Sequence, residues 1–346
     1  MGFGAAPFAI GGLVPGNAVF LAPLSGITDV PFRRRARRFG AGLVVSEMVA
    51  SGELVRGFRE SMLRAMRDGD GVHVVQLAGR DPAWMQEAAE RAADMGADII
   101  DINMGCPAKK VVGGQSGSAL MREPDLALRL VDATVAGAGA VPVTLKMRLG
   151  WDHQTINSPE IAARAEAAGV KMITVHGRTR QQLYTGTADW HAIAAVKAAV
   201  SVPVVANGDL VEAGQRAAML AASGADAVMI GRGTYGRPWF PGLLAGAIGM
   251  DDLAVLSFAD FVVDHYEDML VHYGNEMGLR HSRKHLSWYL EGFAAASGAE
   301  LAADRAAIMV TPSPAVAIER LRRVLGDVSI AEIERGTDAT RRREAA

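Results

Sequence analysis

Polar side chains stand at the ends of six short apolar segments, and their types suit ligand binding and proton transfer. In chain order they are Gln76; Asp101, Asn103 and Cys106; Lys146 and Arg148; His176 and Arg178; Asn207, Gly208 and Asp209; and Gly231, Arg232 and Gly233. A single lysine at such a place usually snorkels to the surface. Six polar segment ends are costly to bury without a polar ligand, so the pattern predicts one binding site.

Cys106 is the one cysteine of the chain, which excludes an internal disulfide and a multi-cysteine zinc site. It lies between Gly105 and Pro107, and Lys109 and Lys110 follow. A lone cysteine is often a small buried hydrophobe. In these polar surroundings the thiol is a candidate proton donor, or a nucleophile once deprotonated.

Two other segment ends indicate a flavin. The amide of Gln76 can hydrogen-bond the edge of a flavin ring, and Lys146 can stabilise negative charge on the reduced ring. Gly208 and Gly231–Gly233 predict a phosphate site, to which Arg232 adds charge. Lys146 as the Schiff-base lysine of an aldolase-type barrel is the alternative. The match of residues 231–236 to G-x-G-x-x-G is disfavoured as a Rossmann motif because no strand pattern follows it.

The elements that must position these residues alternate regularly. Eight apolar runs, each predicted to be a buried parallel strand, are 19–26, 43–49, 72–79, 98–107, 141–150, 172–179, 202–209 and 227–234. Alanine-rich amphipathic stretches separate them, with Asp81, Ser158 and Asp189 as predicted N-caps or near-caps. The alternation predicts a (β/α)8 TIM barrel, whose active site is built at the carboxyl ends of the strands.

The pattern changes after the barrel. Helices are predicted over 258–273, 280–293 and 314–325, without further strands. We therefore expect an N-terminal arm (1–17), a barrel that carries the site (18–249), a small all-helical domain (250–335) and a flexible tail (336–346).

Composition limits the class of protein. Half of the 346 residues are hydrophobic, and 36 Lys and Arg face 38 Asp and Glu, so the net charge of −2 excludes a globally basic nucleic-acid binder. No apolar run is long enough to span a membrane, and no basic leader precedes an apolar stretch. We expect a cytoplasmic protein.

Eight ordered motifs carry a family resemblance. LAPLSGITDVPFR, VVSEM, VQLAG, DINMGCPAKKV, VTLKMRLGW, VHGRTR, VVANGD and MIGRGTYGRPW resemble the bacterial tRNA-dihydrouridine synthases. The likeness covers about residues 18–245, continues weakly through RHSRKHLSWYLEGF, and is strongest to the B-type branch, which includes nitrogen-regulation-associated members.

The resemblance implies that D-loop uridines of tRNA are reduced to dihydrouridine with FMN and NADPH. It also implies that the barrel (18–249) is the catalytic FMN-binding domain and that the helical domain (250–335) binds tRNA. Hydride would pass from flavin N5 to uracil C6, and Cys106 would protonate C5. The implied FMN contacts are Ala22, Pro23, Leu24, Gln76, Lys146, His176, Asn207, Gly208, Asp209, Gly231 and Arg232. The predicted substrate contacts are Asn103, Arg148, Arg178, Arg280, Arg283 and Lys284. We expect no metal and a monomer.

Two other functions stay open: a flavin oxidoreductase of a free pyrimidine, and a non-catalytic RNA-binding or regulatory protein. Two clusters are also ambiguous. The arginines of residues 33–38 are interpreted as a solvated helix face, with RNA contact as the alternative. His281 and His285 are interpreted as surface or RNA-facing histidines rather than as metal ligands.

Overall fold

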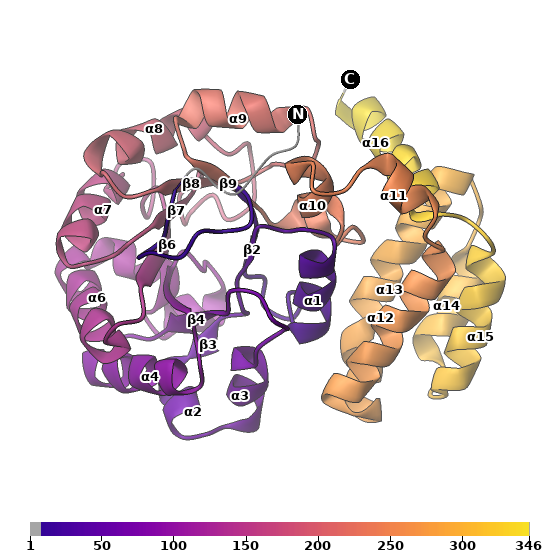
Figure 1. The fold of residues 1–346 in the computed structure, drawn as a ribbon, viewed down its shortest axis with the longest axis horizontal. Helices are drawn as coiled ribbons and strands as arrows, with labels where there is room; N and C mark the ends of the chain where they lie inside the picture. The colour runs from indigo at the N-terminus through magenta and orange to yellow at the C-terminus, as the bar shows by residue number, and fades with distance from the viewer. Residues whose placement is uncertain (1–7, 346) are drawn as a thin grey trace.

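One parallel sheet forms the centre of the larger part of the molecule. The computed structural model describes residues 8–345. The strands pair in the order β2-β1-β9-β8-β7-β6-β5-β4-β3, and helices surround them (Figure 1). The strands are β1 (Val19–Leu21), β2 (Leu43–Val44), β3 (Val49–Ala50), β4 (Val74–Ala78), β5 (Ile99–Met104), β6 (Val143–Arg148), β7 (Ile173–His176), β8 (Val204–Asn207) and β9 (Ala227–Ile230).

The sheet is the predicted eight-stranded barrel, with one strand in two pieces. β2 pairs with β1 and β3 pairs with β4, although both belong to one predicted strand, 43–49. Between them Val45 bridges to Val74, and the Ser46 amide donates to the Val74 carbonyl at 3.0 Å. The strand therefore closes the sheet into a (β/α)8 barrel. All eight predicted runs are longer than the strands because their polar ends turn into loops.

The barrel helices follow the predicted pattern. They are α1 (Val30–Arg38), α2 (Ser51–Val55), α3 (Arg59–Ala65), α4 (Pro82–Asp94), α5 (Lys109–Gly113), α6 (Pro124–Ala138), α7 (Ser158–Ala167), α8 (Trp190–Ala199), α9 (Gln215–Ser223) and α10 (Phe240–Ala245), with short 3-10 turns η1 (Gly117–Arg122) and η2 (Arg232–Thr234). Asp81 and Asp189 cap α4 and α8 as predicted. Ser158 is the first residue of α7, next to the N-cap Asn157, which makes no side-chain cap bond, so Ser158 is a near-cap.

The amino end of the barrel interior is closed by apolar side chains. Ile10, from the segment predicted as an arm, is fully buried in a cluster with Phe20, Ile99, Met172 and Met229. A backbone bridge between Ile10 and Leu13 shapes this segment. The described part of the arm thus packs as a plug of the barrel.

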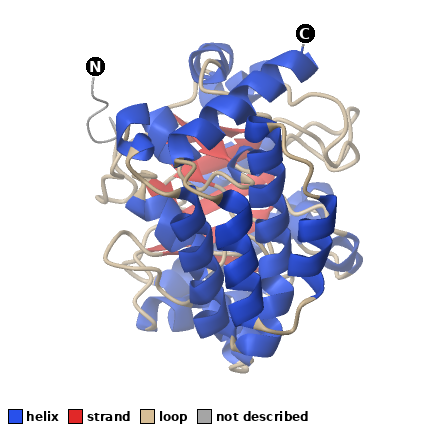
Figure 2. Ribbon diagram, turned by 90° about the vertical axis from the view of Figure 1, so that its right-hand side faces the viewer, coloured by secondary structure: helices blue, strands red, loops and turns tan. Residues whose placement is uncertain are grey.

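A helical domain follows the barrel, as predicted. It contains α11 (Met250–Ala254), α12 (Phe258–Tyr273), α13 (Asn275–Ser297), α14 (Ala302–Val310), α15 (Pro314–Leu325) and α16 (Ile330–Ala345). These helices stand together beside the barrel, next to α1 and α10, and cover the strands when viewed from their own side (Figures 1 and 2). α16 crosses the boundary predicted at 335. No helix within residues 8–345 is long and apolar enough to cross a membrane.

Buried ion pairs join the two parts. Arg237 pairs with Glu334 of α16, whose carboxylate also accepts from Trp239 Nε1 at 2.8 Å. Arg35 of α1 bonds Asp268 of α12 at 2.7 Å. Within the barrel, Arg33 of α1 bonds Asp68 at 3.0 Å. Arg33 and Arg35 are buried, so their interpretation as part of a solvated helix face was wrong.

The predicted surface role of His285 was also wrong. Its ring is 1% exposed and lies between Phe32 of α1 and His265 of α12. His281 is half-buried and stacks on Tyr273. No group of three metal-ligating side chains occurs in the described part of the chain.

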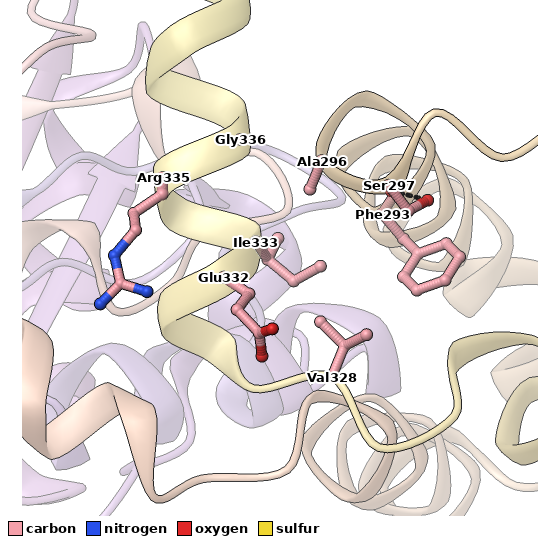
Figure 3. A pocket seen from close by; sticks show the side chains of 8 residues that line it. All are labelled: Phe293, Ala296, Ser297, Val328, Glu332, Ile333, Arg335 and Gly336. Carbon is pink, nitrogen blue, oxygen red and sulfur yellow. Dashed lines mark hydrogen bonds between the residues drawn. The ribbon is translucent and has the colours of Figure 1, made fainter.

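One cavity lies within the helical domain, between α13 and α16 (Figure 3). It is lined by Phe293, Ala296, Ser297, Val328, Glu332, Ile333, Arg335 and Gly336. Because every lining residue belongs to the helical domain, this cavity is separate from the strand ends.

Candidate active site

The strand register brings the predicted polar residues to one end of the barrel. Gln76 is aligned with Asp101, which is aligned with Thr144 on the next strand. One step further along, Asn103 is aligned with Lys146. Beyond that, His176 is aligned with both Arg148 and Asn207. Side chains two apart on a strand share a face, so these rows form successive layers of the barrel interior.

A continuous chain of hydrogen bonds runs through the first two layers. Thr144 Oγ1 donates to Asp101 Oδ1 at 2.6 Å, and Gln76 Nε2 donates to Asp101 Oδ2 at 2.7 Å. Asn103 Nδ2 donates to Gln76 Oε1 at 2.7 Å. Burial raises the pKa of Asp101, whereas these donors and the charge of Lys146 act in the opposite direction. Both Asp101 oxygens accept, as an ionised carboxylate does.

The same chain continues to the main chain of Cys106. Asn103 Oδ1 accepts from the amides of Gly105 and Cys106, at 3.2 and 3.0 Å. The Cys106 carbonyl accepts from the amide and hydroxyl of Ser118, at 3.0 and 2.9 Å. The thiol residue is half-buried and its backbone is held from both sides. It lies just beyond the carboxyl end of β5.

Lys146 lies within the barrel mouth on the neighbouring strand. Its Nζ donates to Asn207 Oδ1 at 3.2 Å, while Asn207 Nδ2 donates to the Met229 carbonyl at 2.8 Å. Burial, with the charge of Arg148, lowers the pKa of Lys146 to about 8, and Asp101 acts in the opposite direction. An anionic ligand beside Lys146 would raise this pKa again and stabilise the charged form.

Arg148 and Arg178 reach the mouth, but internal partners occupy them. Arg148 donates to the carbonyls of Gly105, Thr179 and Leu183. Arg178 forms a two-pronged ion pair with Asp209 and also donates to the Thr185 and Gly186 carbonyls. Each is 1% exposed. Their contacts brace the loop after β7, and their predicted contact with substrate stays a prediction.

The ends of β1, β8 and β9 offer space for a phosphate. A side chain at Gly231 would meet nothing closer than Leu24 at 3.7 Å and Ala22 at 3.8 Å. Arg232 is exposed, and it pairs with Asp209 at 2.9 Å. The opening N–H groups of the 3-10 turn η2 have no acceptor within the turn. Space, free amide donors and a cation fit a phosphate group, and the polar layers beside them fit a heterocycle.

Gly208 has a steric reason to be glycine. Its φ is +123°, and an added Cβ would lie 2.7 Å from Ala188 Cβ and 3.0 Å from His176 Cδ2. The glycine lets the loop after β8 pass close to His176.

His176 has a neighbour that sequence reasoning missed. Burial, aided by Arg148 and Lys146, lowers the pKa of His176 well below its ordinary value, so the ring is neutral at pH 7. Tyr184 lies 6.5 Å from that ring, between centroids, and is 50% exposed. The Arg232 guanidinium is 4.9 Å from the Tyr184 ring. An aromatic ring exposed at the mouth is suited to contact a planar ligand.

Helix α13 borders the same mouth. Its predicted substrate residues Arg280, Arg283 and Lys284 are exposed. Lys284 Nζ lies 3.0 Å from where a Cβ at Gly26 would be, so it reaches the loop after β1. Trp288 stacks on Tyr235 at 4.0 Å with an interplanar angle of 9°. The helical domain thus places cations beside the barrel opening.

The fold and this polar mouth define the class of (β/α)8 barrel proteins with a ligand site at the carboxyl ends of the strands. Solved structures agree on the fold. Morphinone reductase matches with a TM-score of 0.52 at 15% identity, over 72% of this chain and 91% of its own. An old yellow enzyme homologue from Zymomonas mobilis matches at 0.50 and 14%, over 71% and 92%.

Sequence comparison gives the family. The family model described as dihydrouridine synthase matches residues 20–319. A probable tRNA-dihydrouridine synthase of Rhizobium leguminosarum bv. phaseoli is 57% identical over 89% of this chain and 95% of the relative. That of Rhodobacter capsulatus is 60% identical over 84% and 92%. The tRNA-dihydrouridine synthase B of Pseudomonas aeruginosa is 46% identical over 79% and 84%. The chain belongs to the dihydrouridine synthase family.

Proposed function

We propose that this protein reduces the C5–C6 double bond of D-loop uridines in tRNA, with FMN as cofactor and NADPH as reductant. The observation that carries the proposal is the position of Cys106. Its backbone is fixed at the carboxyl end of β5, beside the strand that bears Lys146. A proton donor and a buried cation at one barrel mouth suit reduction of a polarised ring.

The residues present fit FMN. The space at Gly231 with Arg232 suits the phosphate, and the side chains of Asn103, Lys146 and Asn207 suit the ring edge. FMN, when bound and reduced by NADPH, supplies a hydride to uracil C6. Gln76 is fully buried beneath these side chains, so its proposed ring contact is made from below the mouth.

The chain itself supplies the proton. Cys106 gives the thiol proton to C5, so that one hydride and one proton together saturate the double bond. Solvent then reprotonates the thiolate. Lys146 in its charged form stabilises negative charge at the ring edge, and the neutral His176 acts as a hydrogen-bond partner rather than a cation.

The tRNA is held by a patch rather than by net charge. Arg280, Arg283 and Lys284 lie exposed on α13, and Lys284 reaches the barrel opening. Such cations suit the phosphates around a uridine that must leave its stack to enter the barrel. A cytoplasmic location and a monomeric state stay predictions.

The experiment is a product assay. The purified protein is incubated with NADPH and unmodified tRNA, and the digested nucleosides are analysed by mass spectrometry. We expect dihydrouridine in the tRNA and no reduction of free uridine, uracil or orotate. Reduction of a free pyrimidine without tRNA would favour the pyrimidine oxidoreductase. Bound flavin without any reduction would favour the regulatory protein.

A further inference from the structure

Asp101 is the charged member of the polar barrel layers to which neither a ligand contact nor a proton transfer has been assigned. It is 3% exposed, in the middle of β5, and lies below the residues that reach the opening. A carboxylate in the barrel interior is costly to bury unless donors satisfy it. Asp101 has two, Thr144 and Gln76, and it also supports the charge of Lys146.

The hydrogen bonds that begin at Asp101 have a single direction. Both oxygens of Asp101 accept hydrogen bonds, so Gln76 turns its NH2 toward it. The oxygen of Gln76 then faces Asn103, which must donate. The oxygen of Asn103 is thereby left for the amides of Gly105 and Cys106, which can only donate. Every donor in the chain points from Cys106 toward Asp101.

Each amide is thus fixed at both of its ends. If Gln76 turned over, its oxygen would face the Asp101 carboxylate and its NH2 would face the NH2 of Asn103. A buried donor or acceptor left without a partner loses its hydration without compensation, and the cost is larger when the group is charged. This requirement defines which edge of the Gln76 amide is offered to a ring above it.

We propose that Asp101 is a positioning residue of the reaction: it sets the direction of the Gln76–Asn103 amide chain, and thereby the orientation of Gln76 toward the cofactor and the backbone position of Cys106. The proposal rests on the proposed roles of Gln76 and Cys106. Asp101 itself touches neither the reacting ring nor the thiol in this scheme.

The test is a double-mutant cycle that reverses the chain while satisfying it. Asp101→Asn keeps the direction, because the new amide accepts from Gln76 and donates to Thr144, whose hydroxyl can rotate. Asn103→Asp conflicts with it, because the new carboxylate and Asp101 both demand the NH2 of Gln76. In D101N/N103D the carboxylate at 103 accepts from Gln76 and from the backbone, and the amide at 101 donates to Gln76. All groups are satisfied, and Gln76 is turned over.

The first readout is Tm, measured on the full chain with and without FMN. We expect a small loss for D101N, a large loss for N103D, and recovery of most of that loss in D101N/N103D. Losses that simply add would overturn the proposal. This readout does not require flavin binding, so it also distinguishes failure of the amide chain from failure of the proposed function.

The second readout is the midpoint potential of bound FMN, which a purely structural role would not move. We expect D101N, which removes a negative charge but keeps the amide direction, to raise the potential. We expect D101N/N103D, which keeps the wild-type net charge but turns Gln76 over, to differ from the wild-type potential although its fold is restored. A double variant with the wild-type potential would overturn the orientation of Gln76 by Asp101.

The third readout uses the single cysteine as its own probe. The rate of alkylation by iodoacetamide should be close to wild-type in D101N and severalfold changed in Asp101→Leu, which removes both acceptors. Equal rates in the two variants would overturn the link to Cys106. If D101L does not fold, the Tm cycle still decides.

Discussion

The two ends of the barrel interior are built from the same strands but from opposite chemistry. On one face of three strands, two residues apart, Val74 precedes Gln76, Ile99 precedes Asp101 and Val205 precedes Asn207. The first of each pair belongs to an apolar cluster that Ile10 completes. The second belongs to the polar mouth. On each of these strands, the residue that packs in the apolar cluster and the residue that belongs to the candidate site are therefore only two positions apart.

The largest effect is expected at the polar end, where removal of the Cys106 thiol should strongly slow the reaction without changing stability. Cys106→Ala should slow reduction of tRNA uridine by about 10²–10⁴-fold, the usual contribution of a positioned proton donor. Flavin binding, reduction by NADPH and Tm should stay close to wild-type, since the backbone of residue 106 carries the hydrogen bonds. Stopped-flow absorbance of each half-reaction measures this. Full turnover by C106A would remove Cys106 from the chemistry.

The opposite change is made at the closed end. Ile10→Ala removes a fully buried side chain from the apolar cluster and should cost roughly 2–5 kcal/mol of unfolding free energy. Urea denaturation gives the loss. The rate of uridine reduction, measured where the variant is folded, should be unchanged. A variant as stable as wild-type but impaired in reduction would reverse the assignment of the two ends.

Replacing Lys146 measures how much a buried charged lysine at the barrel mouth destabilises the folded state. In the protein without flavin its pKa is about 8, below the ordinary 10.5, so the folded state disfavours the charged form. This penalty is fully present below about pH 8 and disappears as the pH rises toward 10.5. Lys146→Met should therefore gain up to roughly 3 kcal/mol below that pH, at about 1.36 kcal/mol per unit. Unfolding curves across the pH range check it, and a pH-independent difference would contradict it.

The smallest effect is expected for the exposed cations of α13 beside the barrel opening. Replacing Arg280, Arg283 and Lys284 by Gln should weaken tRNA binding about tenfold and flatten its dependence on salt, because phosphate contacts release counterions. The matched control is Lys171→Gln, an exposed lysine just before β7 and so at the closed end. Filter binding at several salt concentrations measures both. Equal losses of tRNA affinity in the two variants would show that these α13 cations do not form the tRNA-binding surface.

Much of the fold could be predicted from periodicity. The ranges predicted for α12 and α15 match the structure at both ends, because an apolar stripe and clear caps bound each helix. The strands were predicted too long, since polar residues at a barrel mouth continue the apparent pattern beyond the last backbone pair. The split at Ser46 was invisible because it depends on a bridge to another strand.

The site was predictable in its position but not in its connections. Sequence reasoning placed Arg33 and Arg35 in a solvated face because Asp68 and Asp268 come from distant segments. It noted Asp101 without a role, since only the structure brings Gln76 and Thr144 against it. Tyr184 was missed because it lies in a loop, which has no periodic sequence pattern. Arg148 and Arg178 hold this loop through its carbonyls, and only the structure shows these contacts.

We propose that flavin bound at the polar end of the barrel reduces uridine within tRNA. The most direct measurement is anaerobic reoxidation of the NADPH-reduced protein, followed by its visible absorbance. Unmodified tRNA should restore the oxidised flavin spectrum rapidly, and the same tRNA already carrying dihydrouridine should not. Equal reoxidation by both tRNAs, or by neither, would contradict the account.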